Sequence, residues 1–133
     1  MVSTRWTQSN KTVYNIGYHI IWCPKYKRKV LVGEVEKRLR ELIQRKAGEI
    51  DVSIETLEVM PDHLHLFIKA PPTASPHWIV QQLKGYSSHE LRKEFEPLRT
   101  RLPTLWTRSY YVESYGHISG TAVKKYVEEQ KNQ

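Results

Sequence analysis

The chain has 133 residues, with 21 Lys and Arg against 14 Asp and Glu, a formal net charge of +7. Its length and its 39% hydrophobic content suit one globular domain, which we assign to residues 1–133. No run of about 18 apolar residues occurs, so we expect no membrane span, and the N-terminus lacks the apolar core of a signal peptide. The single cysteine, Cys23, cannot form an internal disulfide, which fits a cytoplasmic location.

The excess of positive charge favours a polyanionic partner. One basic cluster carries an aromatic residue inside it and consists of Lys25, Tyr26, Lys27, Arg28 and Lys29. Because exposed bases stack on aromatic rings while phosphates pair with cations, this composition suits single-stranded nucleic acid. A basic surface that is only solvated is the alternative interpretation.

Hydrophobic periodicity predicts the elements of the first half in chain order. Residues 12–22 alternate apolar and polar side chains and predict a strand. Residues 34–47 place apolar side chains at spacings of three and four, which predicts an amphipathic helix. Residues 52–60 alternate again, Pro61-Asp62 predicts a tight turn, and residues 63–69 predict the returning strand.

The second half begins with a predicted helix. Ser75 and Pro76 are typical of a helix cap and a first helical residue, and the helix is expected to reach about Phe95. A basic loop containing Pro97 and Pro103 follows. Residues 105–112 predict a further strand, and residues 121–132 a short helix.

The order β-α-β-β-α-β followed by a helix predicts an α+β fold. Two split βαβ units of this kind give a ferredoxin-like sandwich, which RNA-recognition modules share. We therefore expect a four-stranded antiparallel sheet with two helices on one face, and an additional C-terminal helix. The other face of the sheet stays open for ligands.

The histidines of the segment MPDHLHLFI lie two residues apart on a predicted strand. His63 and His65 therefore share one face, while Leu64 points to the other. A two-residue turn places Met60 opposite His63 and Glu58 opposite His65. Glu58 is then a carboxylate that either orients an imidazole or is a ligand itself. Metal site, polar patch and chance all remain open for this spacing alone.

Other polar residues are expected to have ordinary roles. His19, His77, His89 and His117 have no partner by spacing, which favours surface or strand-edge positions. Asp62, in the turn, is expected to cap backbone N–H groups.

The last predicted helix carries Tyr126 and Gln130 four residues apart on one ridge. A packing role for Tyr126 is the simpler interpretation. Beside two imidazoles, however, the pair describes a hydroxyl nucleophile and a carbonyl ligand next to a divalent ion. A metal that polarises a phosphate would compensate for the weakness of a phenol as a nucleophile.

Several stretches together resemble one family over nearly the whole chain. They are YHIIWCPKYKRKVL (18–31), EVMPDHLHLFIKAPP (58–72), QQLKGYSSHELR (81–92), LWTRSYYVESYG (105–116) and KKYVEEQ (124–130). The chain resembles the single-tyrosine HUH transposases, the small "transposase A" enzymes of insertion sequences that move as single-stranded DNA. HUH denotes histidine, hydrophobic residue and histidine, here His63, Leu64 and His65.

The resemblance implies an activity and a site. His63, His65 and Gln130 would bind Mg²⁺ or Mn²⁺, and Tyr126 would cleave single-stranded DNA to leave a 5′-phosphotyrosine and a free 3′-hydroxyl. The DNA partner would be a hairpin near the element end, which the cluster from Lys25 to Lys29 is placed to contact. The family works as a homodimer, in which the tyrosine helix of one subunit can complete the histidine site of the other.

Other functions fit parts of the pattern. A non-catalytic single-stranded nucleic-acid-binding module would keep the basic and aromatic surface without the site. A nicking enzyme of rolling-circle replication shares the histidine motif but is usually longer. A domesticated relative that processes host repeats would keep the whole site.

Overall fold

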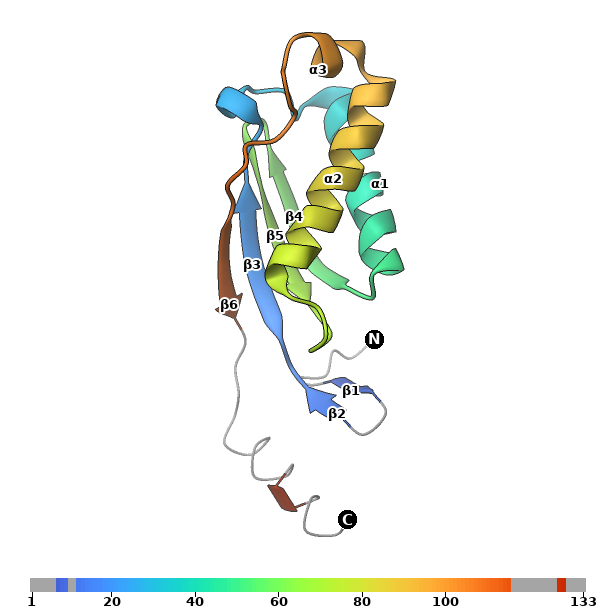
Figure 1. Ribbon diagram of the computed structural model, residues 1–133, viewed down its shortest axis with the longest axis vertical. Coiled ribbons are helices and arrows are strands. Elements are labelled where there is room, and N and C mark those ends of the chain that lie inside the picture. Colours follow the sequence, from blue (N-terminus) through green and yellow to red (C-terminus); the bar gives the residue numbers. More distant parts are fainter. Residues whose placement is uncertain (1–6, 10–11, 116–126, 129–133) are drawn as a thin grey trace.

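The computed structural model describes residues 7–9, 12–115 and 127–128, with side chains from Tyr14 onward (Figure 1). The predicted helix at 121–132 therefore lies, apart from Val127 and Glu128, outside the described residues, and so do Tyr126, Gln130 and His117. In the part that is described, no helix is long and apolar enough to cross a membrane.

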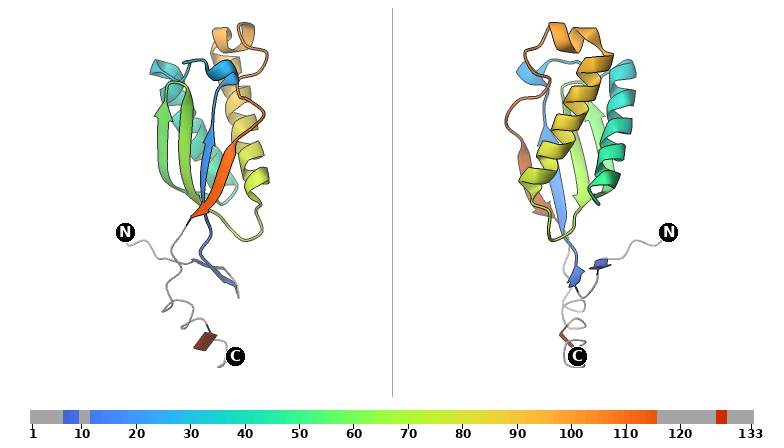
Figure 2. Two further views of the ribbon diagram at one scale, coloured as in Figure 1. Left: turned by 90° about the vertical axis from the view of Figure 1, so that its left-hand side faces the viewer. Right: turned by 45° about the vertical axis from the view of Figure 1, so that its right-hand side comes forward.

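One antiparallel sheet forms the centre of the molecule. Its strands are β3 (Gly17–Trp22), β4 (Ser53–Met60), β5 (His63–Lys69) and β6 (Tyr111–Tyr115), in the order β4-β5-β3-β6. Figure 2 shows helices α1 (Gly33–Glu49) and α2 (Pro76–Glu94) over one face and the other face uncovered. The predicted ferredoxin-like sandwich is confirmed.

Side-chain alternation creates the core between the sheet and the helices. On β5, Leu64, Leu66 and Ile68 are fully buried, so the histidines between them face the open side. The helices contribute buried side chains at the predicted spacing, namely Leu39, Leu42, Ile43, Ile79 and Leu83. Truncating one such leucine to alanine typically costs about 2–5 kcal/mol, so this core fixes which residues of β5 face outward.

The two long helices begin and end close to the predicted positions. Ser75 is the N-cap of α2, and its Oγ accepts a hydrogen bond of 3.1 Å from the backbone N–H of Trp78, as predicted. The helix ends at Glu94 because Phe95 adopts an extended conformation. The region expected to be a basic loop contains instead a short helix, α3 (Glu96–Thr100), with Pro97 in its first turn, where proline is tolerated.

The strand predicted over 12–22 is divided in two. β2 (Thr12–Tyr14) pairs with β1 (Thr7–Ser9) in a separate two-stranded sheet, and only β3 joins the main sheet. The break at Asn15 and Ile16 has a local cause. The Ile16 carbonyl accepts from the N–H of Ala70, and Lys69 Nζ donates to Asn15 Oδ1, so the chain is held here by the end of β5.

The strand predicted over 105–112 is also wrong, since β6 begins only at Tyr111. The preceding backbone is used elsewhere. Lys84 Nζ donates to the carbonyls of Thr107 at 2.6 Å and Ser109 at 3.3 Å. Trp106 makes an isolated bridge to Pro24, and its ring is buried. Apolar residues in this segment therefore indicate burial under α2 rather than membership of the sheet.

Candidate active site

The two histidines of the HxH segment stand on the open face of the sheet at the start of β5. The turn at Pro61-Asp62 sets the register, in which Met60 lies opposite His63 and Glu58 opposite His65, as predicted. The ring centroids of His63 and His65 are 5.0 Å apart, and the rings are inclined by 71°. The fold thus brings the imidazoles together as a neighbouring pair.

His65 belongs to a hydrogen-bonded chain across three strands, which we call the histidine network (Tyr111, Glu113, His19 and His65). His65 Nδ1 lies 3.1 Å from His19 Nε2, and His19 Nδ1 lies 3.2 Å from Glu113 Oε1. The Tyr111 hydroxyl donates to Glu113 Oε2 at 2.7 Å. Strand register places Glu113 of β6 directly opposite His19 of β3. The expectation that His19 has no partner is therefore wrong.

The chemistry of the histidine network determines the tautomer of His65. A carboxylate only accepts hydrogen bonds, so His19 Nδ1 must donate to Glu113. In neutral His19 the other nitrogen, Nε2, is then an acceptor, and His65 Nδ1 must donate to it. His65 therefore keeps its lone pair on Nε2, which is the form that binds a metal through that atom.

His63 is held in the same tautomer by a different group. Its Nδ1 lies 2.8 Å from Asp62 Oδ1, and Asp62 Oδ2 lies 3.9 Å from Lys27 Nζ. Asp62 is expected to cap backbone N–H groups, but the main partner of its carboxylate is the His63 imidazole. Among the described residues, neither His63 nor His65 uses Nε2 in a hydrogen bond.

Electrostatics keep His65 suited to a cation. Partial burial lowers the pKa of His65, and the neighbouring imidazoles of His63 and His19 lower it further, while Glu58 acts in the opposite direction. The hydrogen bond from His63 lowers the pKa of Asp62, and the one from Tyr111 lowers the pKa of Glu113. The uncharged imidazole is thus favoured at His65, while the carboxylates that hold the neighbouring imidazoles of His63 and His19 stay ionised.

The histidine pair would supply part of a metal-ligand set. No three His, Cys, Asp or Glu side chains in the described ranges are grouped as a metal site. The two free Nε2 atoms fit a divalent ion that takes further oxygen ligands from elsewhere. Glu58 is exposed opposite His65, and within the same ranges it makes no hydrogen bond or ion pair. Its role and that of Gln130 stay predictions.

The basic cluster lies beside the pair. Lys25 to Lys27 form the 3₁₀ turn η1, in which Tyr26 and Lys27 have positive φ angles of 59° and 50°. Tyr26 is 64% exposed, and Lys25 Nζ lies 5.3 Å from its ring centroid. Arg28 and Lys29 are exposed. A strained turn that presents an aromatic ring next to cations is suited to stacking, and its role in binding DNA stays a prediction.

Sequence reasoning missed His19, Glu113 and Tyr111. The signal for His19 was present, because its strand directs Ile20 and Trp22 to the core and therefore His19 to the open face. In the expected topology β3 lies next to β5, so His19 had to lie near His65. Glu113 and Tyr111 could not be found in this way, because the strand that carries them was predicted several residues too early.

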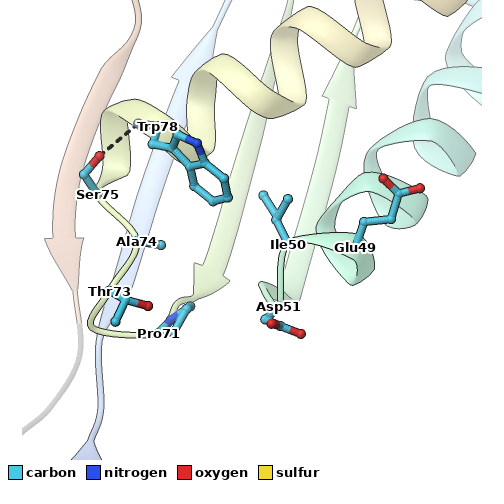
Figure 3. A pocket seen from close by; sticks show the side chains of 8 residues that line it. All are labelled: Glu49, Ile50, Asp51, Pro71, Thr73, Ala74, Ser75 and Trp78. Carbon is cyan, nitrogen blue, oxygen red and sulfur yellow. Dashed lines mark hydrogen bonds between the residues drawn. The ribbon is translucent and has the colours of Figure 1, made fainter.

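A further depression of the surface lies away from the histidine pair. A cleft of about 660 Å³ lies between the end of α1 and the loop that leads into α2, with Ile50 and Trp78 on opposite sides (Figure 3). This is the end of β5 opposite to His63, since the loop follows Lys69. The cleft is therefore separate from the histidine pair.

A ferredoxin-like sandwich with paired imidazoles on its open sheet face is the architecture expected of an HUH enzyme. The family model described as "Transposase IS200 like" matches residues 12–130. The chain belongs to the IS200-like transposase family.

Individual relatives agree with this assignment. The ISDra2 transposase TnpA of Deinococcus radiodurans is 36% identical over 120 residues, covering 89% of this chain and 86% of the relative. The transposase of insertion sequence IS200 from Salmonella typhimurium is 32% identical over 107 residues, covering 79% of this chain and 70% of the relative.

Two solved structures share the fold. A crystal structure from Deinococcus radiodurans R1, described as a transposase, has a TM-score of 0.77 and 32% identity and covers 93% of this chain and 97% of its own. A REP-associated tyrosine transposase bound to a REP hairpin has a TM-score of 0.59 at 14% identity, with 92% of this chain and 68% of that one covered. At that identity the second structure supports the fold alone.

Proposed function

We propose that this chain is a DNA transposase that cleaves and rejoins single-stranded DNA at the ends of an insertion sequence. Membership of the IS200-like family supports the class of activity. The observation that carries the proposal is the pair His63 and His65, each with Nδ1 held by a neighbour and with Nε2 unbonded among the described residues. Such a pair suits metal-assisted transfer of a phosphoryl group.

The proposed metal ligands are His63, His65 and Gln130. When bound, a divalent ion would polarise the scissile phosphate and neutralise the charge that develops on it. The chain's own residues orient the imidazoles, through Asp62 for His63 and through His19 for His65. Two nitrogen ligands favour Mn²⁺ over Mg²⁺, since Mg²⁺ prefers oxygen.

The proposed nucleophile is Tyr126. Its phenol loses its proton as the oxygen attacks the phosphorus, the bond from phosphorus to the 3′-oxygen breaks, and the leaving oxygen takes up a proton to become a hydroxyl. The products are a 5′-phosphotyrosine and a free 3′-hydroxyl. Rejoining reverses the step, because a 3′-hydroxyl attacks the phosphotyrosine and releases the tyrosine. No external energy source is needed, since each exchange conserves one phosphodiester.

The proposed DNA ligand is a hairpin near the element end, contacted by the cluster from Lys25 to Lys29. The proposed active form is a homodimer in which the tyrosine helix of one subunit can complete the histidine site of the other. The hairpin contact rests on the family resemblance together with the exposed ring of Tyr26 and the cations around it, and the homodimer rests on the family resemblance. The protein would act in the compartment that holds the DNA.

A covalent-adduct assay tests the nucleophile. Labelled single strands of the DNA that flanks the gene are incubated with the protein, with and without Mn²⁺, and separated on a denaturing gel. We expect a Mn²⁺-dependent adduct that Tyr126→Phe abolishes and the matched variant Tyr86→Phe retains. Binding of the same strands without an adduct would instead support a non-catalytic binding module.

Mixing two inactive variants tests the dimer. Tyr126→Phe keeps the histidine pair, and His63→Ala keeps the tyrosine. If one subunit completes the site of the other, the mixture should form an adduct that neither variant forms alone. A mixture without an adduct, although its subunits exchange, would exclude sharing between subunits.

A further inference from the structure

A basic groove lies on the helical layer, away from the open face of the sheet. One depression of about 640 Å³ runs between α2 and α3, and another of about 430 Å³ between α2 and the segment before β6. Both are lined by Gly85 and Ser88, so the two depressions adjoin at these residues of α2. We call the two adjoining depressions the α2 groove.

The lining of the α2 groove carries only basic charges. It contains no Asp or Glu, and its basic side chains are Lys25, Lys84, Arg92, Lys93, Arg99 and Arg108. None of these forms an ion pair with another residue of the described ranges. Lys93 and Arg108 are exposed and make no hydrogen bond within those ranges, so their charges are available to a ligand.

Gly85 is not explained by the protein's own packing. It lies inside α2, where glycine is less favourable than alanine by about 1 kcal/mol. A Cβ at this position would meet nothing within 4 Å, and the φ angle of Gly85 is not positive. The missing side chain leaves the floor of the α2 groove open, so that a bound strand can approach the helix closely.

The α2 groove and the histidine site share one wall. Lys25 lines the groove, and Lys27, at the other end of η1, lies 3.9 Å from the Asp62 carboxylate that holds His63. Tyr26 stands between these lysines with its ring exposed. A single strand leaving the histidine site can therefore stack on Tyr26 and continue along a row of cations.

We propose that the α2 groove binds the sugar-phosphate backbone of the single DNA strand whose other part occupies the histidine site, across η1. This inference rests on the proposed function, because it takes the strand at the histidines as its starting point. An acidic protein partner would need the same charges but would not need an open helix floor at a glycine.

Salt-dependent binding tests the charges. Fluorescence anisotropy with labelled oligo-dT strands of increasing length, without metal, gives the affinity at several NaCl concentrations. For a single strand the log–log slope changes by about 0.7 for each phosphate contact. We expect Lys93→Gln and Arg108→Gln each to reduce the slope by about that amount on long strands and to leave short strands unaffected. Lys37→Gln, on the exposed face of α1, removes the same charge outside the groove and should change nothing.

Gly85→Leu separates binding from folding. Leucine favours the helix and should raise the melting temperature. It also fills the floor of the groove and should lower the affinity for long strands at least fivefold. If this variant and both glutamine variants bind long strands as tightly as the wild type, the proposal that the α2 groove binds DNA is overturned. The adduct assay is independent of this result, so a wild-type adduct without a groove effect refutes only the groove. A groove effect without an adduct refutes only the proposed chemistry.

Discussion

Replacing His19 by phenylalanine should weaken Mn²⁺ binding without unfolding the protein. The His19 ring lies flat on Phe67, with centroids 4.2 Å apart and planes inclined by 6°, and a phenyl ring keeps that stacking. It removes the acceptor of the 3.1 Å hydrogen bond from His65. His65 then loses the group that selects its tautomer and orientation. The change thus separates the orientation of a ligand from the packing of the sheet.

The magnitude follows from what the partners of a metal-bound histidine contribute. Their loss typically costs a factor of about 10–100 in metal affinity, which corresponds to about 1.4–2.7 kcal/mol of binding free energy. We expect a loss in this range, because His19 is the one hydrogen-bond partner of the His65 side chain within the described residues. His19→Gln, which keeps an acceptor oxygen, should recover part of the affinity.

Isothermal titration calorimetry with Mn²⁺ measures the effect, and the melting temperature without metal shows that the fold is intact. His77→Phe is the matched control, since His77 bonds to the Tyr110 hydroxyl on another part of the surface and should leave the affinity unchanged. If His19→Phe binds Mn²⁺ as tightly as the wild type, the argument from tautomer selection is refuted.

The buried Ser87 hydroxyl accepts a hydrogen bond from Trp106 Nε1. Ser87→Ala should therefore lower the free energy of unfolding by about 1–3 kcal/mol, and the control Ser88→Ala should not. Equal losses of the two variants in urea denaturation would contradict this. Stability should fall as the pH drops below about 6.5, because the lowered pKa of His65 lets the unfolded chain bind the proton first. Urea denaturation between pH 7 and about 5 should show a smaller decline in His65→Gln. Burial raises the pKa of Tyr115, so above about pH 10 the unfolded chain ionises first and stability is lost. Tyr115→Phe should flatten this alkaline loss in thermal melts, and an unchanged profile would exclude Tyr115 as its source.

Local patterns in the sequence were sufficient for the elements whose burial is regular. The alternation through Leu64 and Leu66 and the turn at Pro61-Asp62 determine both the strand pair and the face of the histidines. The start of β6 was not predictable in this way. Trp106 is apolar because it packs under α2, where Ser87 accepts its N–H, and nothing in the local pattern distinguishes this from a strand.

The site shows the same division. The pair His63 and His65 is visible in the sequence because its spacing matches the period of a strand. Glu113, which holds His19, is not visible, because it approaches His19 only through the pairing of β3 with β6. Asp62 was assigned to the backbone because turn aspartates usually cap N–H groups, and here the adjacent imidazole is the nearer donor.

The histidine network also has a consequence for the order in which the protein becomes competent during synthesis. Two of its three hydrogen bonds join positions separated by 46 and by 94 residues along the chain. Contacts at such separations form late in folding. The ribosome also synthesises the chain from its N-terminus to its C-terminus. His65 thus leaves the ribosome long before Glu113, and its tautomer cannot be selected until β6 docks on β3. A nascent or C-terminally shortened chain holds His63 through Asp62 but leaves the tautomer of His65 unselected, so the capacity to bind a metal ion tightly arises only when β6 is in place.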